Sequence, residues 1–279
     1  MQKLEETKEV IKSRITDVAS EQSNMVQVLY SSRSGDSGVS HSIFQISPKD
    51  KLRHLSQCKF GYVSRWALDC FLEEYETRQA AAAADFYRYI SGIPDAASLW
   101  GHVFERLVFN HLVGIDTEYK FPMRGLSESI RRKMTWTFRG RIPRFNFRQK
   151  EDFIIAITDA IQNKYPLHLV PSIRNFEAVD SIVYDPNEVL TCTQITVSSK
   201  HPISVSGLQR IQSWLEPGNK LLADLRPSKP RPWRIIFIVP PRGEASFELQ
   251  QLKGDTARGE WAGKVHQYVL GLDVLRKPE

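Results

Sequence analysis

The chain has 279 residues, of which 41% are hydrophobic and 25% are charged, and its formal net charge is +6. A chain of this length and composition can bury a core of ordinary size, so we expect a globular protein with one large domain. No apolar run approaches the roughly 18 to 20 residues that cross a bilayer, and the charged first twenty residues do not have the pattern of an ordinary signal peptide. This predicts either an intracellular setting or a fragment of a longer protein.

The first part of the chain divides into a polar lead and a helical segment. Residues 2–20 are predicted to be helical, and residues 31–42 (SSRSGDSGVSHS) form a Ser/Gly-rich linker with too little apolar surface to fold. Between residues 47 and 92 an apolar period near 3.6 predicts two or three helices, which end at Gly92 and Pro94. The predicted division is a lead with linker, a helical segment packing on the core, and a main domain, at 1–45, 46–95 and 96–279.

The main domain combines helices and strands in an order typical of a mixed α/β fold. The segment 95–115 carries an apolar stripe at helical spacing and ends at Gly114. The run RIIFIV (234–239) is apolar on both faces, which predicts a central strand covered by helices. Further helices are predicted at 151–165, 204–217 and 260–272, and further strands at 118–126, 134–147 and within 175–201.

A basic segment lies between residues 124 and 150. It contains nine Lys or Arg residues and one acid, Glu128, and aromatic residues are interleaved with the cations. Such a segment can neutralise phosphates while its aromatics stack on bases, and it can equally be a solvated face whose aromatics, such as Trp136 and Phe138, point into the core. The two interpretations are compatible. The predicted nucleic-acid contacts are Arg131, Arg132, Lys133, Arg139, Arg141 and Arg144.

The segment 175–201 has the pattern of two short apolar strands joined by a turn at 185–187. Asp180 opens the first strand and Gln194 interrupts the second, which predicts that the two side chains lie side by side at one end of the pair. An aspartate here can also be a turn or cap residue. A buried amide such as Gln194 can instead be a structural hydrogen-bond bridge, since leaving it unpaired costs about 1–3 kcal/mol.

These positions also fit the chemistry of metal-assisted phosphodiester cleavage. Mg²⁺ prefers oxygen ligands, is usually held by one or two carboxylates with a substrate phosphate, and activates a water. Asp180 and Gln194 would supply oxygens, Glu105 lies on the preceding predicted helix, and Lys200 and His201 follow the second strand. Each also has a structural explanation, namely a surface ion pair for Glu105 and a solvated turn for Lys200 and His201.

Three stretches, in this order, resemble the restriction-endonuclease-like domain at the C-terminal end of Crinkler and RHS-type effector proteins: 90–113, 169–186 and 191–211. The resemblance covers roughly residues 60–240. It implies a mixed sheet flanked by helices, of the PD-(D/E)xK nuclease class, here with an N-terminal helical extension. Longer members of the family carry an upstream P-loop ATPase module, which this chain lacks, so we expect a shortened member that works alone or with such a module.

The resemblance also implies roles for individual residues. Asp180 corresponds to the metal-binding aspartate, and Glu105 to the helical acid that shapes the metal's outer shell. Gln194 stands where the wider class has Asp or Glu, and Thr196 stands where it has lysine. Glutamine still ligates through its carbonyl oxygen but adds no charge, and threonine cannot replace an ammonium group. An active enzyme would therefore have to bring in Lys200.

Two functions follow from these residues. The first is a Mg²⁺- or Mn²⁺-dependent nuclease acting on DNA, with the catalytic set Glu105, Asp180, Gln194 and Lys200. The second is a catalytically inactive effector module that binds nucleic acid or protein. DNA is the expected partner, RNA or a host protein is the alternative, and no membrane partner is expected. The short basic patches RRK and SKPRPWR would support nuclear import, and the family resemblance also raises a secreted effector route.

Overall fold

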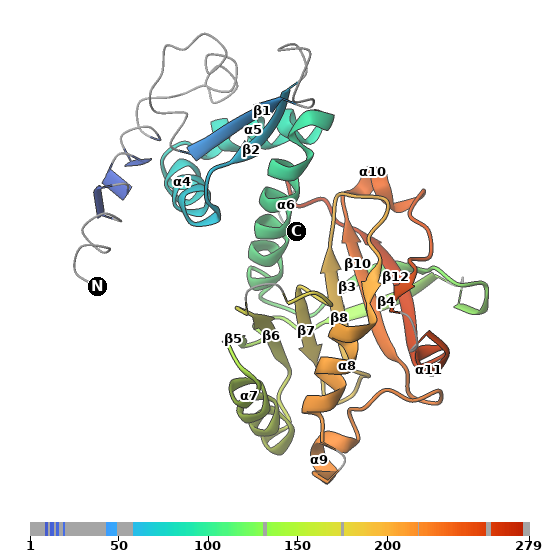
Figure 1. Cartoon of the computed structure of the whole chain (residues 1–279). Helices are drawn as coiled ribbons and strands as arrows, with labels where there is room; N and C mark the ends of the chain where they lie inside the picture. Colours follow the sequence, from blue (N-terminus) through green and yellow to red (C-terminus); the bar gives the residue numbers. More distant parts are fainter. Residues whose placement is uncertain are drawn as a thin grey trace. The chain divides into compact units, whose positions relative to one another are not determined.

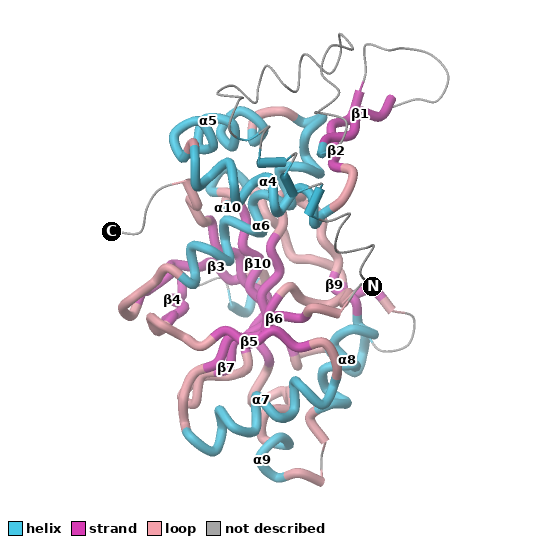
Figure 2. The backbone as a smooth tube through the Cα atoms, turned by 90° about the vertical axis from the view of Figure 1, so that its left-hand side faces the viewer, coloured by secondary structure: helices cyan, strands magenta, loops and turns pink. Residues whose placement is uncertain are grey.

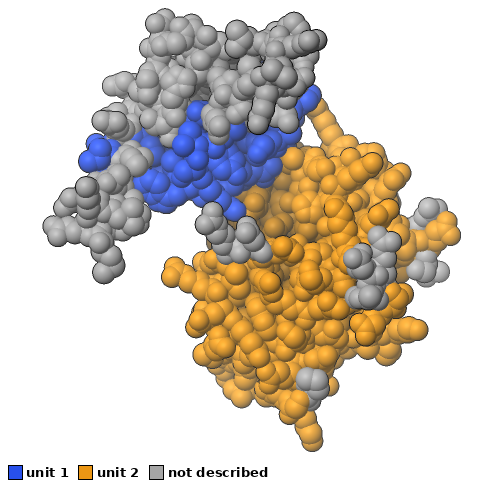
Figure 3. All heavy atoms as spheres, in the orientation of Figure 1, with its two compact units in different colours: residues 1–103 blue, residues 104–279 orange. Residues whose placement is uncertain are grey.

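The computed structural model describes most of the chain as two compact units. One unit lies within residues 1–103 and the other within residues 104–279 (Figure 3). The division falls inside helix α6 (Ala97–Val113). The predicted linker at 31–42 and most of the predicted helical lead lie outside the described residues. The residues described are 9–10, 12–13, 15–16, 19, 43–48, 58–130, 133–173, 176–216, 218–254 and 258–275.

The first unit pairs two strands and follows them with helices. Its elements are β1 (Phe44–Pro48), β2 (Cys58–Tyr62), α4 (Arg65–Arg78), α5 (Ala80–Ser91) and η1 (Pro94–Ala96). The described residues before β1 at positions 9–19 are helical. Helix α4 begins where the Ser64 hydroxyl accepts a hydrogen bond from the Ala67 amide. The helices α4 and α5 match the prediction, whereas neither β1 nor β2 was predicted and β2 lies in the segment predicted to be helical, because a strand of five residues is too short for its period to be detected.

The second unit is built on a mixed eight-stranded sheet (Figure 1). Its strands are β3 (Tyr119–Gly125), β4 (Lys133–Phe138), β5 (Arg144–Phe147), β6 (Leu167–Pro171), β7 (Ser181–Tyr184), β8 (Thr191–Ile195), β10 (Trp233–Val239) and β12 (Val265–Gly271). They lie in the order β4-β3-β12-β10-β8-β7-β6-β5. Strands β8, β10 and β12 are parallel, and β7 is antiparallel to both β6 and β8. The predicted α/β class with a mixed sheet is therefore confirmed.

Helices and short elements complete this unit. They are η2 (Glu128–Ile130), α7 (Lys150–Asn163), β9 (Ile203–Ser204), α8 (Val205–Trp214), α9 (Lys220–Ala223), α10 (Pro241–Glu244), β11 (Leu252–Lys253) and α11 (Arg258–Trp261). Helices α7 and α8 match predicted segments, and the Ser204 hydroxyl accepts a hydrogen bond from the Gly207 amide at the start of α8. None of the described helices is long and apolar enough to cross a membrane.

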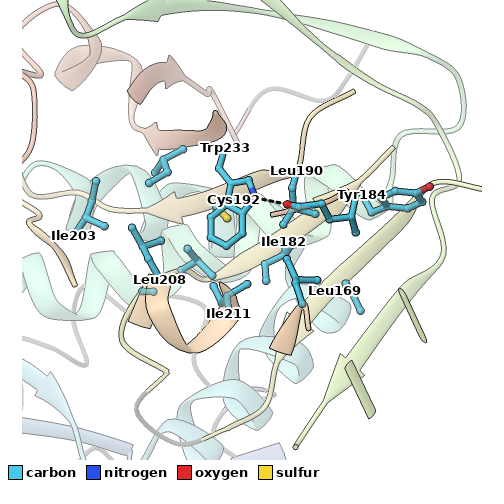
Figure 4. Packing of buried hydrophobic residues seen from close by; sticks show 14 of the residues in the cluster. Leu169, Ile182, Tyr184, Leu190, Cys192, Ile203, Leu208, Ile211 and Trp233 are labelled. Atoms are coloured by element: carbon cyan, nitrogen blue, oxygen red, sulfur yellow. Dashed lines mark hydrogen bonds between the residues drawn. The ribbon is translucent and has the colours of Figure 1, made fainter. Parts of the chain in front are cut away.

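One face of the sheet, here called the α8 face, is covered by α7 and α8 (Figure 1). Ile182, Cys192 and Phe237 on the strands join one buried cluster with Leu208 and Ile211 of α8. Figure 4 shows Ile182 and Cys192 packed beside these two helical residues. Because side chains alternate along a strand, every second residue of β8 faces this core.

The opposite face, here called the α6 face, carries His168, Val183 and Thr191 in register across three strands. The His168 ring centroid lies 6.0 Å from that of Phe109 on α6 and 6.3 Å from that of Phe138 on β4. The C-terminal part of α6 and the β3–β4 hairpin therefore both pack on this face. Figure 2 shows α8 to the right of β6, and β3 and β4 to its left.

The predicted helix at 260–272 is wrong. This segment forms the short helix α11 and then the strand β12, which pairs with β10 from Val265 to Gly271. The sequence VHQYVLG is rich in β-branched and aromatic residues, which suit a half-buried pleated surface. Pairing beside the most apolar strand of the sheet overrides the weak helical pattern of the segment.

Candidate functional site

A β-bulge places Asp180 at the end of the β7–β8 pair. The Asp180 amide donates to the Thr193 carbonyl oxygen at 2.9 Å, although Thr193 is already the register partner of Ser181. Two residues on the β7 side thus oppose one residue on β8, as in a bulge. The Asp180 Oδ2 accepts the Ile195 amide at 2.6 Å. The carboxylate therefore lies beside the Gln194–Ile195 peptide, and the prediction that Asp180 and Gln194 share one end of the strand pair agrees with this geometry.

Gln194 is buried on β8, with 3% of its surface exposed. Alternation places its side chain with Cys192, on the α8 face, and its register partner on β10 is Phe237. Within the described part of the chain, the Gln194 Oε1 forms no hydrogen bond. A buried carbonyl oxygen without a donor costs about 1–3 kcal/mol, so this amide is suited to an added ligand.

The strand β8 leads into a tight polar turn. Thr196 extends the ladder, since its amide donates to the Ile238 carbonyl oxygen at 3.0 Å, and its hydroxyl accepts the Ser198 amide at 3.1 Å. The Nδ1 of His201 lies 3.1 Å from the same hydroxyl oxygen. Lys200 is exposed, and its backbone is tied to the Ser198 hydroxyl. The turn thus holds the His201 ring against the Thr196 side chain.

Two buried glutamines anchor this turn, Gln250 just before β11 and Gln267 on β12. The Gln250 Oε1 accepts the His201 amide at 2.6 Å, and its Nε2 donates to the Ser199 carbonyl oxygen at 3.1 Å. Gln267 on β12 in turn pairs with both backbone groups of Gln250, each at 2.9 Å. Sequence reasoning missed these residues, although a glutamine inside an apolar strand was the signal that singled out Gln194 on β8. Together they fix the backbone on which His201 is carried.

Glu105 lies on α6 and approaches from the other face of the sheet. It stands one helical turn before Phe109, whose ring packs near His168, so both residues belong to the stripe of α6 that faces the sheet. Gln194 projects from the α8 face. The structure thus places the Asp180 carboxylate beside the Gln194–Ile195 peptide, with Glu105 on the α6 side and Lys200 on the exposed turn beyond β8.

The predicted turn between β7 and β8 is present, and Asp185 at this turn forms an ion pair with Arg139. The Asp185 Oδ1 accepts the Asn187 amide at 2.9 Å, and its Oδ2 lies 2.8 Å from the Arg139 Nε. Arg141, in the left-handed region with φ 55°, lies 3.1 Å from an Asp116 carboxylate oxygen. Both predicted phosphate contacts are therefore paired with acids, although both remain exposed at the surface.

The other cations of the basic segment differ in their surroundings. The Arg144 guanidinium lies 5.0 Å from the ring centroid of Phe109, a cation–π contact, and Lys133 is exposed on β4. Trp136 and Phe138 are buried, as the core interpretation of this segment predicts. Arg131 and Arg132 lie outside the described residues. Lys133 and Arg144 are thus the described cations of the predicted set that no acid neutralises.

The donor set at the bulge is one carboxylate and one amide. Within the described ranges, no group of three or more His, Cys, Asp or Glu residues is arranged to hold a metal ion. One carboxylate with further neutral oxygens fits Mg²⁺, which usually keeps several waters and takes phosphate oxygens from its substrate. No protein-family model, no curated protein and no solved structure matches the chain. The chemistry of the site must therefore be inferred from its own residues.

Proposed function

We propose that the second unit is a restriction-endonuclease-like domain, of the type found in Crinkler and RHS-type effectors, that acts on DNA with a divalent cation. The observation that carries this proposal is the contact of the Asp180 carboxylate with the Ile195 amide, one peptide beyond the buried Gln194. The Asp180 carboxylate reaches the peptide that follows Gln194, and the buried Gln194 Oε1 has no hydrogen-bond donor among the described residues. A cation would satisfy that oxygen, and a phosphate would complete its coordination.

The chain's own residues would divide the work as follows. Asp180 and Gln194 would hold Mg²⁺ or Mn²⁺, whereas Glu105 lies on the opposite face of the sheet from Gln194 and is left out of this set. When bound, the ion would neutralise the phosphate and lower the pKa of an attacking water. The exposed Lys133 and Arg144 would hold the DNA backbone, and Lys200 would add positive charge at the turn.

The direct test is nicking of supercoiled plasmid with Mg²⁺ or Mn²⁺. The informative variant is Asp180→Asn, because an Asn carbonyl oxygen can still accept the Ile195 amide while the negative charge is removed. Asp85→Asn is the matched control, since Asp85 is exposed in a surface pair with Arg88 in the other unit. We expect nicking by the wild type and the control, and none by Asp180→Asn. Equal nicking by all three proteins would remove Asp180 from the site.

A second candidate is a binding module of the same fold without catalysis. One observation and the family resemblance favour it: the Asp180 Oδ2 already serves a backbone amide, and the resemblance places Thr196 where the class has lysine. Such a module would bind DNA, RNA or a host protein without cutting. Wild-type protein that binds a duplex in a gel-shift assay, yet nicks no plasmid with either ion, would establish this function in place of the first.

A further inference from the structure

The side chain of His201 lies against Thr196, the residue that the family resemblance places where the nuclease class has lysine. Thr196 is two residues beyond Gln194, and the hydrogen bond from its amide to Ile238 keeps it in the ladder, so both side chains face the same side. The His201 Nδ1 lies 3.1 Å from the Thr196 hydroxyl oxygen. The imidazole thus lies directly beyond the threonine hydroxyl, next to the proposed site.

From this contact we propose that His201 is the general base of the proposed nuclease and takes the place of the lysine. The inference rests on the proposed function. With Nδ1–H donating to Thr196, the Nε2 keeps its lone pair, and Nε2 has no hydrogen-bond partner within the described residues. Nε2 takes one proton from the attacking water as the water oxygen bonds to phosphorus. The phosphorus–oxygen bond to the leaving sugar breaks, that oxygen is protonated by solvent, and Nε2 then returns its proton to solvent.

The surroundings of His201 suit this role. Its backbone is fixed by the Gln250 Oε1 at 2.6 Å, so the ring is carried by an anchored turn and not by a loose loop. Burial lowers the pKa of His201, which keeps the ring neutral at neutral pH. The charged residues nearest along these segments are Lys200 and Glu248, and neither is a cause of the lowered pKa. Lys200, by contrast, is exposed on the turn.

The test compares His201→Gln with three other variants of the full chain: His266→Gln, Asp180→Asn and Lys200→Gln. His266→Gln is the matched control, because His266 pairs with Arg234 at the far end of the parallel strands. Removing a general base lowers the rate by about a hundred- to ten-thousand-fold. We expect a loss of this size in plasmid nicking for His201→Gln and none for His266→Gln. The wild-type rate should rise with pH through an acidic pKa, and the residual rate of His201→Gln should lack this rise.

A second readout is independent of cutting. With Ca²⁺ in place of Mg²⁺ and a short DNA duplex, the ring signals of His201 in an NMR spectrum, assigned by their loss in His201→Gln, should shift on binding. Unshifted signals in a bound complex overturn the inference. The inference is also overturned if the wild type and His201→Gln nick the plasmid while Asp180→Asn and Lys200→Gln do not. That result would assign the role of general base to Lys200. A wild type that never nicks overturns the proposed function and this inference together.

Discussion

The carboxylate of Asp180 accepts a hydrogen bond from the amide of Ile195 at 2.6 Å. A side-chain oxygen thus takes the place of a backbone carbonyl oxygen at the end of the β7–β8 ladder. The bulge at Asp180 makes this contact available, because it sets the two strands out of simple register. The same residue is therefore part of the framework and a candidate metal ligand. Any substitution at Asp180 has to be judged for both effects.

Asp180→Ala should destabilise the protein more than Asp180→Asn. Alanine leaves the Ile195 amide without its acceptor, which costs about 1–3 kcal/mol, whereas an Asn oxygen can still accept the bond. Urea unfolding of both variants and the wild type measures the difference. Equal stability of the two variants would show that the bond to Ile195 contributes little. If Asp180→Ala is the less stable variant, its loss of nicking does not separate folding from chemistry, and Asp180→Asn has to be compared instead.

A buried hydroxyl pair joins the same two strands. The Ser181 Oγ and Thr193 Oγ1 lie 2.6 Å apart, and both residues are fully buried. Thr193→Val leaves the Ser181 hydroxyl unpaired and should cost about 1–3 kcal/mol, while adding Ser181→Ala should recover much of that loss. A double-mutant cycle by urea unfolding measures the coupling. Additive costs would mean that the two hydroxyls do not depend on each other.

Gly207 on α8 has no room for a side chain. A Cβ at this position would lie 2.4 Å from the Ala178 Cβ, so Gly207→Ala should destabilise by about 1–3 kcal/mol through overpacking. Ala178→Gly in the same protein should restore much of the stability. Gly259→Ala on α11 is the control, since nothing lies within 4 Å of a Cβ there. A neutral Gly207→Ala in thermal unfolding would mean that α8 can shift away from Ala178.

The sequence predicted those parts of the fold that are governed by local patterns. The apolar stripe before Gly114 and the serine that opens α8 identify two helices, and the run RIIFIV identifies a central strand. The turn at 185–187 was enough to place Asp180 and Gln194 at one end of a strand pair. These features depend on residues close together in the chain, so periodicity and capping chemistry report them directly.

The remaining features depend on contacts between distant segments. β12 is a strand because β10 pairs with it, although its own residues also fit a helix. The bulge at Asp180 depends on backbone register, which side-chain patterns do not specify. The pairing of Gln250 with Gln267, and of Arg139 with Asp185, joins segments that no local pattern relates. The anchored turn and the neutralised cations could therefore not be predicted from the sequence.

His168 should make stability depend on pH. Burial is the main cause, and the Arg144 charge the second, that lower its pKa to about 4 from an ordinary value of 6.5. Between these values the unfolded chain binds the proton and the folded chain does not. Stability therefore rises with pH through this window and falls as pH drops from 6.5 towards 4, by about 3 kcal/mol in total. Urea unfolding of wild type and His168→Phe across the window should show a smaller dependence in the variant. Parallel curves would contradict the assignment.

The salt dependence of DNA binding should distinguish paired from unpaired cations. The sequence alone predicts a shallower salt slope once Arg139 and Arg141 are removed. Their acidic partners change this expectation, because a cation already neutralised by a carboxylate releases fewer counterions from DNA. The double variant Lys133→Gln with Arg144→Gln should reduce the slope of log K against log salt by about 2, as two lost phosphate contacts require.

The matched comparison is Arg139→Gln with Arg141→Gln, which should reduce the slope less. Glutamine suits this test because it keeps a long, unbranched side chain at Arg141. The φ of Arg141 is 55°, so a substitution that changes the backbone preference of this residue is undesirable. Fluorescence anisotropy of a labelled duplex over a salt series measures both slopes, and circular dichroism checks that each variant is folded. An equal reduction in the two doubles would mean that the ion pairs open on binding. An unchanged slope in both double variants would mean that these cations form a solvated surface and do not contact DNA, because counterion release requires direct neutralisation of phosphates.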